Sequence, residues 1–246
     1  MKVYDLHVHS EFSEGESTLT QLADTAKALG YSGMCFVSYW NGRNQMEKER
    51  QEIENVSKSS CVQIFIGFEA RDTKELRKLA EMRKEFDLLL VGGGDLELNR
   101  AAVETPEVDI LAHPEYGRHQ VGKMADSGLN HVLVKLAAKN NVAIEINFGS
   151  IFMSSGYNRA KVLRSIRQNI MLAKKFKAPI ILCSGALSHF ELRDSQSMIS
   201  MATVLGMDLN EAKDAISKVP EKTVKDSIEK RGKDWVMPGV KVIKGD

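Results

Sequence analysis

The stretch NVAIEINFGSIFMSSGYNRAKVLRSIRQNIMLAKKFKAPIILC at residues 141–183 has an apolar run at each end and a long helical pattern between them. The runs Val142–Asn147 and Pro179–Cys183 have the length and composition of buried strands, and Asn158–Phe176 has the apolar spacing of a helix. Two strands joined through one helix pair in parallel, with a right-handed crossover. This stretch therefore indicates an α/β fold.

The same alternation fills the rest of the chain before residue 141. Helical patterns over about 18–29, 44–58 and 130–140, and one that starts at Asp72, separate further apolar runs. These runs are the five remaining expected strands: Val3–Val8, Met34–Val37, Val62–Gly67, Leu88–Val91 and Val108–Leu111. Because the runs are apolar without alternation, we expect both of their faces to be buried. The pattern predicts a TIM-like barrel of about seven parallel strands, with an open doubly wound sheet as the alternative.

The pattern changes after the seventh expected strand. Three consecutive helices are expected to pack over the end or the wall of the barrel: Ser195–Leu205, Asp208–Ser217 and Glu221–Arg231. Val240–Ile243 is expected to form a short edge strand. Since no repeat or linker interrupts the chain, we expect residues 1–246 to form one domain, with 190–246 as its mostly helical C-terminal extension.

The composition excludes several classes of protein. Hydrophobic residues make up 43% of the 246 residues and charged residues 27%, which excludes wholesale disorder. No apolar run approaches the roughly 20 residues of a membrane helix, and the first residues are too polar for a signal peptide. The cysteines Cys35, Cys61 and Cys183 lie in apolar runs and are expected to be buried and reduced. We therefore expect a cytoplasmic protein without membrane association.

Polar residues follow several of the expected strands. His7 and His9 end the first strand, Glu69 follows the third and His113 follows the fifth. Parallel barrels place functional groups at these strand ends, and imidazole and carboxylate groups bind zinc and manganese. The four residues are therefore candidate ligands of a single Zn or Mn ion. The alternative is that the histidines are structural and bond to loop carbonyl groups.

The charges are unevenly distributed although the net charge is only +1. Residues 1–145 carry 17 basic and 23 acidic side chains, whereas residues 146–190 carry seven basic and no acidic side chains. Most of the seven lie on the helix expected at 158–176, where a basic stripe suits contacts with phosphate groups. The candidate RNA-binding residues of this stripe are Arg159, Lys161, Arg164, Arg167, Lys174 and Lys175. The alternative is a solvated outer helix of the barrel.

Two other arginines are candidates for contacts with phosphate. Arg100 follows the glycines at 92–94, and its alternative role is an ion pair with Glu104 at i+4 spacing. Arg118 lies in a loop over 115–127 that has no strong secondary-structure signal, so the loop is expected to become ordered on a partner.

Two motifs near the start of the chain resemble a known enzyme superfamily. Asp5-Leu-His7-Val-His9-Ser10, with Ser13-Glu14-Gly15, is similar to the first motif of the PHP phosphoesterases, which implies a PHP-type barrel with a metal cluster. The superfamily carries Thr-Asp-His where this chain has Ser38-Tyr39-Trp40, and Ser-Asp-Ala-His where it has Ser184-Gly185-Ala186-Leu187. These departures remove ligands of a multinuclear centre, so hydrolysis at such a centre is not expected.

A second resemblance extends over nearly the whole chain. VGGGDLELNRAAVE at 91–104, VDILA at 108–112, GLNHVL at 128–133 and NVAIEINF at 141–148 are similar to the protein component 3 family of archaeal ribonuclease P, the counterpart of the eukaryotic thirty-kilodalton subunit. The resemblance implies a subunit without catalytic residues or a required cofactor of its own. In such a complex the RNA component uses magnesium ions to remove the 5′ leader of precursor tRNA. The implied partners are the RNase P RNA, a small subunit of RNA-recognition-like fold, and precursor tRNA as the substrate of the complex.

Two other functions stay open from the sequence. A metal-dependent PHP-type phosphoesterase with a reduced His/Glu site would use the four candidate ligands. A barrel that acts only as a protein-binding scaffold would have no RNA affinity of its own.

Overall fold

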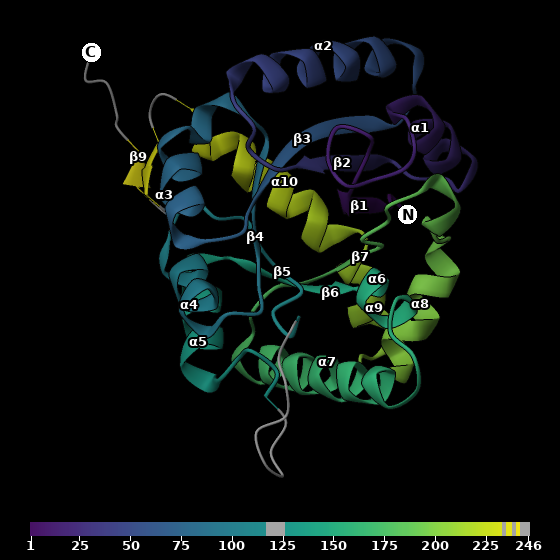
Figure 1. The fold of residues 1–246 in the computed structure, drawn as a ribbon. Coiled ribbons are helices and arrows are strands. Elements are labelled where there is room, and N and C mark those ends of the chain that lie inside the picture. Colours follow the sequence, from purple (N-terminus) through teal and green to yellow (C-terminus); the bar gives the residue numbers. More distant parts are fainter. Residues whose placement is uncertain (117–125, 233–234, 238–239, 242–246) are drawn as a thin grey trace.

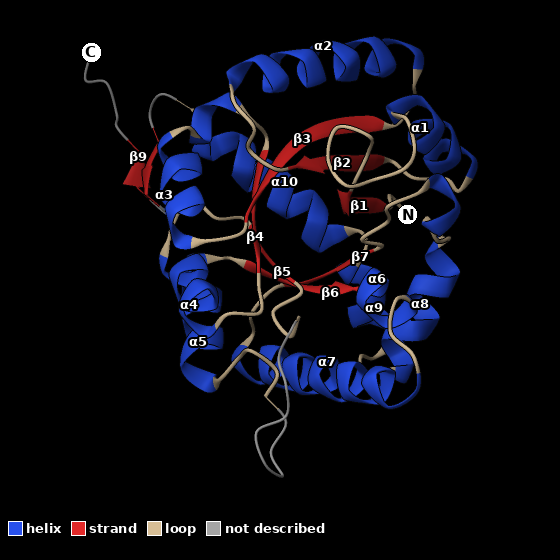
Figure 2. Cartoon of the chain, viewed as in Figure 1, coloured by secondary structure: helices blue, strands red, loops and turns tan. Residues whose placement is uncertain are grey.

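A computed structural model describes residues 1–116, 126–232, 235–237 and 240–241. Its central feature is a sheet of seven parallel strands whose neighbours follow chain order (Figures 1 and 2). The strands are β1 (Tyr4–Val8), β2 (Gly33–Ser38), β3 (Gln63–Ala70), β4 (Leu88–Gly92), β5 (Ile110–Ala112), β6 (Ala143–Asn147) and β7 (Ile180–Cys183). All seven expected strands are present. The prediction of a TIM-like barrel is confirmed, and the open doubly wound sheet is wrong.

The two edges of the sheet meet where β7 ends. Val8 pairs in parallel with Ala186, just beyond β7. The backbone N–H of His9 donates to the carbonyl of Ala186 at 2.9 Å, and that of Gly185 donates to the carbonyl of His7 at 3.1 Å. These bonds bring the first strand beside the last and nearly close the barrel.

Helices surround the barrel, as Figure 2 shows in blue. They are α1 (Leu19–Ala28), α2 (Arg43–Ser59), α3 (Thr73–Glu81), η1 (Arg83–Glu85), α4 (Leu96–Glu104), α5 (His131–Asn140), α6 (Phe148–Phe152), α7 (Gly156–Phe176), η2 (His189–Glu191), α8 (Ser195–Val204), α9 (Leu209–Ala215) and α10 (Lys218–Lys230). Thr18 caps α1 and Asp208 caps α9, each in a full capping box, as their sequence spacing indicates. The helices α4 and α6 were not expected from the sequence.

The helix α10 closes one end of the barrel. Its Val224 joins the apolar cluster inside the barrel, together with Leu6, Leu88 and Ile110 from the strands. The N–H of Tyr4, at the start of β1, bonds to the carbonyl that precedes α10 at Ile216. The closed end is therefore the one where the strands begin, and the ends that carry functional groups stay open.

A network of buried charged side chains connects α10 to the closed end of the barrel. Asp109 precedes β5 and is 2% exposed. Its carboxylate accepts from Arg83 Nη2 at 2.7 Å and from Lys230 Nζ of α10 at 2.8 Å. The same carboxylate accepts the N–H of Leu89 at 2.9 Å. One buried anion thus joins β4, the start of β5 and the last residue of α10.

Several expectations about the end of the chain are corrected or stay open. Val240 does not lie at the edge of the barrel, because β9 (Val240–Lys241) pairs antiparallel with β8 (Trp235–Met237) in a separate sheet. Residues 242–243 of the expected edge strand lie outside the described part of the chain. The assignment of residues 1–246 to one domain stays a prediction. Among the described helices, we find none with the length and apolar character needed to cross a membrane.

Cys61 is also placed differently from the expectation. It is exposed, whereas Cys35 and Cys183 are buried as predicted. The apolar run that starts at Cys61 enters β3 two residues later, so Cys61 itself lies in the turn before the strand.

Glu49 of α2 is a buried carboxyl group, and its burial predicts a pH-dependent stability. Ser38 Oγ donates to Glu49 Oε1 at 2.6 Å, but Oε2 has no hydrogen-bond partner among the described residues. Burial raises the pKa of Glu49 from 4.5 to about 7, against the opposing effect of the Ser38 hydrogen bond. The folded state therefore binds a proton that the unfolded state releases, and the free energy of unfolding falls as the pH rises from 4.5 to 7.

The variant Glu49→Gln removes this titration. We compare the free energy of unfolding of this variant with that of the parent chain at each pH. As the pH rises from 4.5 to 7, this difference should change in favour of the variant by up to about 3 kcal/mol. Urea unfolding at both ends measures the change. The matched control is Glu52→Gln, because Glu52 is exposed on the same helix. A difference between variant and parent that does not change with pH would contradict the prediction.

Candidate functional site

The four candidate metal ligands meet at the open end of the barrel. His7 lies in β1 and His9 directly follows it, Glu69 lies near the end of β3, and His113 follows β5. His7, His9 and Glu69 are nearly fully buried, and the His113 side chain is 19% exposed. The structure therefore brings the four residues together, and metal binding by them stays a prediction.

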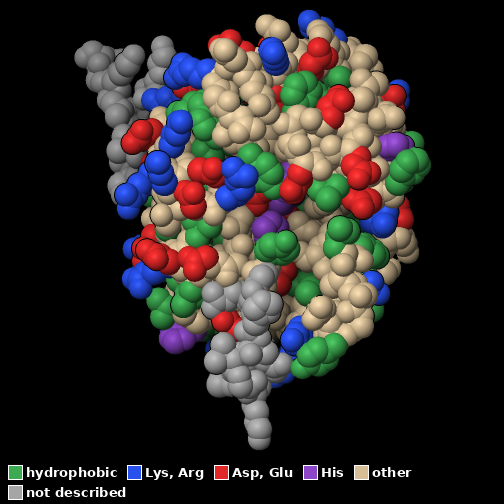
Figure 3. All heavy atoms as spheres, viewed as in Figure 1, with side chains coloured by type: hydrophobic (Ala, Val, Ile, Leu, Met, Phe, Trp, Pro, Cys, Tyr) green, Lys and Arg blue, Asp and Glu red, His purple; other side chains and the backbone are tan. Residues whose placement is uncertain are grey.

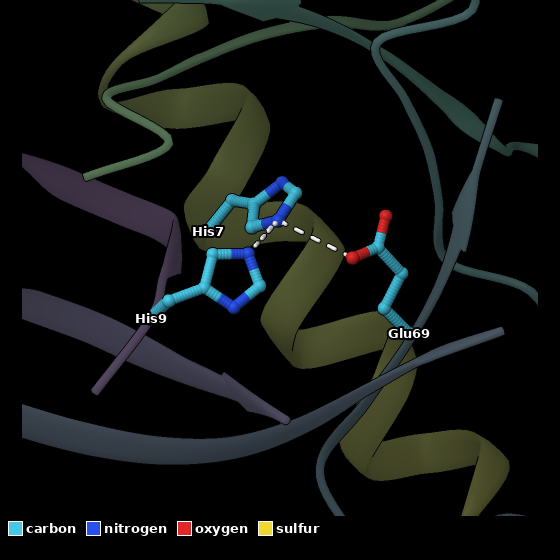
Figure 4. A group of neighbouring side chains, drawn as sticks. All are labelled: His7, His9 and Glu69. Carbon is cyan, nitrogen blue, oxygen red and sulfur yellow. Dashed lines mark hydrogen bonds and ion pairs between the residues drawn. The ribbon is translucent and has the colours of Figure 1, made fainter. Parts of the chain in front are cut away.

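The distances within the cluster are short. His7 Nε2 lies 3.0 Å from His9 Nε2 and 3.8 Å from Glu69 Oε2, as the dashed lines of Figure 4 mark. Ligand atoms of these three residues all lie within 4.8 Å of one another. Glu69 Oε1 forms an ion pair with His113 Nε2 at 3.2 Å, and His113 Nδ1 is buried without a hydrogen-bond partner among the described residues. Short contacts therefore join the four residues into one cluster and leave one ring nitrogen without a bond.

Glu145 of β6 is a further member of the cluster that the sequence analysis did not select. Its Oε1 lies 2.8 Å from His7 Nδ1, and its Oε2 accepts the backbone N–H of His113 at 2.9 Å. The sequence signal is a single carboxylate inside the apolar run at 142–147. Because a buried charge without a partner is costly, such a residue indicates a polar group on a neighbouring strand.

The partners of the two Nδ1 atoms assign the protons of His7 and His9. His7 Nδ1 faces the carboxylate of Glu145, and His9 Nδ1 lies 3.0 Å from the carbonyl oxygen of Val37. Each Nδ1 is therefore the donor, and both Nε2 atoms direct lone pairs toward each other. Two facing lone pairs at 3.0 Å repel, so a proton or a cation between them is favourable.

The surroundings of the two histidines shift their pKa values in opposite directions. Burial favours the neutral form of His7, but Glu145 and then Glu69 outweigh it and raise the His7 pKa to about 9. Burial and the neighbouring His7 lower the His9 pKa to about 4. The pair thus holds one proton near neutral pH, at the position that a cation would otherwise take.

Two glycines at the end of β4 make room for the cluster. A Cβ atom at Gly92 would lie 2.6 Å from Glu69 Oε1, and one at Gly93 would lie 2.5 Å from Pro114 Cα. The glycine run at 92–94 therefore serves close packing beside Glu69 and His113.

A cavity of about 500 Å³ opens above the cluster. All four candidate ligands line it, and so do Tyr39, Gly185 and Leu187, which stand where the PHP motifs carry Asp, Asp and His. In Figure 3, histidine atoms are visible in the hollow at the centre of this face. The departures from the PHP motifs thus replace ligands by a phenol, a glycine and an apolar side chain on the wall of the same cavity.

The candidate RNA-binding residues on α7 fall into two groups. Arg159 Nε donates to the carbonyl oxygens of Ile151 and Ser154, and Lys174 Nζ pairs with Glu211 of α9. These two residues hold neighbouring elements in place. The group that remains along α7 consists of Lys161, Arg164, Arg167 and Lys175; Lys161 is half-buried and the other three are exposed.

The other two candidates do not join this group. Arg100 Nε lies 2.9 Å from Glu104 Oε1, which is the ion pair that the sequence spacing offered as its alternative role. Arg118 lies outside the described residues.

Comparisons of this chain with family models, sequences and solved structures all indicate the same protein family. The model of the family "RNase P subunit p30" matches residues 2–232. Ribonuclease P protein component 3 of Methanosarcina barkeri is 35% identical over 98% of this chain and 96% of its own length, and that of Methanosarcina mazei is 34% identical over 99% and 96%. A chain in the cryo-EM structure of archaeal ribonuclease P with mature tRNA has a TM-score of 0.79 and 28% identity, over 99% of both chains.

Proposed function

Because the chain belongs to the RNase P subunit p30 family, we propose that it is a protein subunit of ribonuclease P. It supports the removal of the 5′ leader from precursor tRNA by the RNA component and contributes no catalytic residue. The observation that carries this proposal is the likeness, over 99% of both chains, to a chain of archaeal ribonuclease P with mature tRNA. The same observation favours the subunit over the metal-dependent phosphoesterase and the pure scaffold.

The surface charge of α7 supplies a physical role in such a complex. A folded RNA brings phosphate groups close together, and a protein that places cations beside them lowers their repulsion and releases counterions. Arg164, Arg167 and Lys175 present positive charge along one helix on a rigid barrel. From the resemblance to the family, the proposed partners are RNase P RNA, which uses its own magnesium ions, a small subunit of RNA-recognition-like fold, and precursor tRNA. The cytoplasm is the proposed location, because precursor tRNA is the substrate.

Reconstitution of precursor-tRNA cleavage tests this function. RNase P RNA and the remaining protein subunits of a relative are assembled with and without this chain, and the rate of 5′-leader removal is measured at modest salt. We expect a faster rate with the chain present. Equal rates with and without it would contradict the proposal.

We also propose that the cluster at the open end of the barrel binds one Zn or Mn ion. The Nε2 atoms of His7 and His9, which face each other at 3.0 Å, and the carboxylate of Glu69 support this, because ligand atoms of the three residues all lie within 4.8 Å of one another. His113 would be the fourth ligand, and Glu145 orients His7 from behind. A metal bound there would supply a Lewis acid at the mouth of the barrel.

Metal analysis tests this site. Protein purified without a histidine tag is expected to take up about one zinc or manganese ion per chain. Glu145→Gln is expected to weaken the affinity about 10- to 100-fold, as is usual when the group that orients a ligand is lost. His131→Ala is the matched control, because His131 is exposed at the start of α5. Uptake that is unchanged in the double variant His7→Ala, His9→Ala would contradict the assignment.

A further inference from the structure

Large apolar side chains are exposed beside the mouth of the barrel. Phe152 is 46% exposed, Met153 74%, Tyr157 71% and Phe190 80%. With Arg193 they form a surface that we call the aromatic rim. Figure 3 shows hydrophobic, basic and acidic side chains on the side of this face that α6, α7 and α8 occupy in Figure 1. Apolar side chains that are exposed together mark a binding surface more often than isolated ones do.

Specific contacts hold the rim together. The guanidinium group of Arg193 lies 4.8 Å from the centre of the Phe152 ring and donates to the carbonyl of Phe190 at 2.8 Å. The Phe190 ring lies 3.9 Å from the His189 ring at a tilt of 37°, and His189 bonds in turn to Ser17. These contacts connect the part of the rim formed by Phe152, Phe190 and Arg193.

Basic side chains adjoin the rim on the side of α7. Lys161 Nζ lies 4.5 Å from the centre of the Tyr157 ring, and the segment 146–190 contains no acidic residue. On the side of α8, Glu191 directs its carboxylate to the backbone N–H of Leu187 at 2.8 Å, and Asp194 directs its own to the backbone N–H of Ser197 at 3.0 Å. The α7 side of this surface therefore suits an occupant that combines negative charge with flat apolar faces.

Single-stranded RNA has this combination of properties. Its bases expose both faces to aromatic side chains, while its phosphates accept cations. In a duplex the base faces are already stacked on one another, so rings on a protein surface cannot reach them. A peptide with acidic and aromatic residues would offer similar chemistry, but the proposed function places RNA beside α7.

We propose that the aromatic rim stacks the bases of an unpaired RNA segment, with the phosphates of that segment on Lys161 and the basic side of α7. The inference rests on the proposed function and adds to it the kind of RNA that this face binds. Phe152, Met153 and Arg193 also line the cavity at the barrel mouth, so the bound strand passes along its edge.

Binding of two RNA probes to the purified chain tests the rim. The probes are a short unstructured oligouridylate and an RNA duplex of matched length, titrated by fluorescence anisotropy. Phe190→Ala and Tyr157→Ala are each expected to weaken binding of the single strand about 5- to 150-fold, the usual range for loss of one stacked base, and to change duplex binding little. Phe190→Tyr keeps the ring and should restore the affinity. Val204→Ala is the matched control, because Val204 is 72% exposed outside the rim.

The outcomes separate this inference from the proposed function. Unchanged single-strand affinity in both alanine variants, or an equal loss on both probes, would overturn the stacking proposal. If the rim binds a protein instead of RNA, we expect unchanged single-strand affinity in both alanine variants. The proposed function is decided by reconstituted cleavage with the unaltered chain, which does not depend on the rim variants. The rim variants should also keep the salt dependence of the parent chain, because they remove no phosphate contact.

Discussion

Replacing Asp109 by alanine is expected to lower the free energy of unfolding by about 3–5 kcal/mol, the usual cost of breaking a buried ion pair from one side. The change leaves Arg83 and Lys230 without their shared anion, and both side chains are less than a tenth exposed. It also leaves the N–H of Leu89 without its acceptor. Because the network joins α10 to the closed end of the barrel, the loss should appear as one cooperative destabilisation of the whole barrel.

Urea unfolding followed by circular dichroism measures this effect. Asp109→Asn tests the role of charge, because it keeps the size of the side chain and is expected to retain most of the loss. Glu104→Ala is the matched control: it breaks the exposed pair with Arg100 and should change stability by less than about 1 kcal/mol. A loss of that small size in both Asp109 variants would show that the Asp109 carboxylate does not hold α10 in place.

Reversing two charges on α7 is expected to have the largest effect on RNA binding. In the double variant Arg164→Glu, Arg167→Glu, affinity for RNase P RNA should fall about 50-fold or more at roughly 0.1 M salt. Each phosphate contact contributes about 0.9 to the slope of log affinity against log salt, so two lost contacts flatten that slope by about 2. Over the tenfold range from roughly 1 M to 0.1 M salt, this flattening corresponds to the expected loss of affinity. Repulsion from the new carboxylates adds to the loss.

Binding isotherms over a series of salt concentrations measure both quantities. The control is Lys218→Glu, Lys225→Glu, which changes the net charge equally but lies on α10, at the closed end of the barrel. It should leave the slope nearly unchanged. Equal slopes in the two double variants would mean that α7 is not the contact surface.

The fold was predictable because its signals are local. Each apolar run at strand length became a strand, and capping pairs such as Thr18 with Gln21 placed helix starts to within a residue. The helix α6 was missed because it has five residues and begins directly at the end of β6. The sequence therefore shows neither a loop before this helix nor enough residues for a helical pattern of apolar side chains. The helix α10 starts three residues before the expected Glu221, at Lys218, and holds Pro220 in its first turn, where proline is tolerated.

The candidate site was predictable only where the strand ends carried its residues. His7, His9, Glu69 and His113 follow from that rule, whereas Glu145 required knowledge of which strand lies beside β1 and β5. The basic stripe had a similar limit. Helical spacing placed its cations on one helix, but the pairing of Lys174 with Glu211 of α9 depends on packing between distant segments.

The position of α10 in the chain has a consequence for biosynthesis. The helix that closes the barrel is encoded after all seven strands. While the ribosome is still making residues 218–230, the emerged strands lack the cover for their inner apolar cluster, and Asp109 lacks Lys230, one of its two cationic partners. Folding of the barrel can therefore be completed only after α10 has been synthesised. A chain that ends before α10 exposes the inner apolar cluster, which makes it prone to aggregation and to degradation by quality-control proteases.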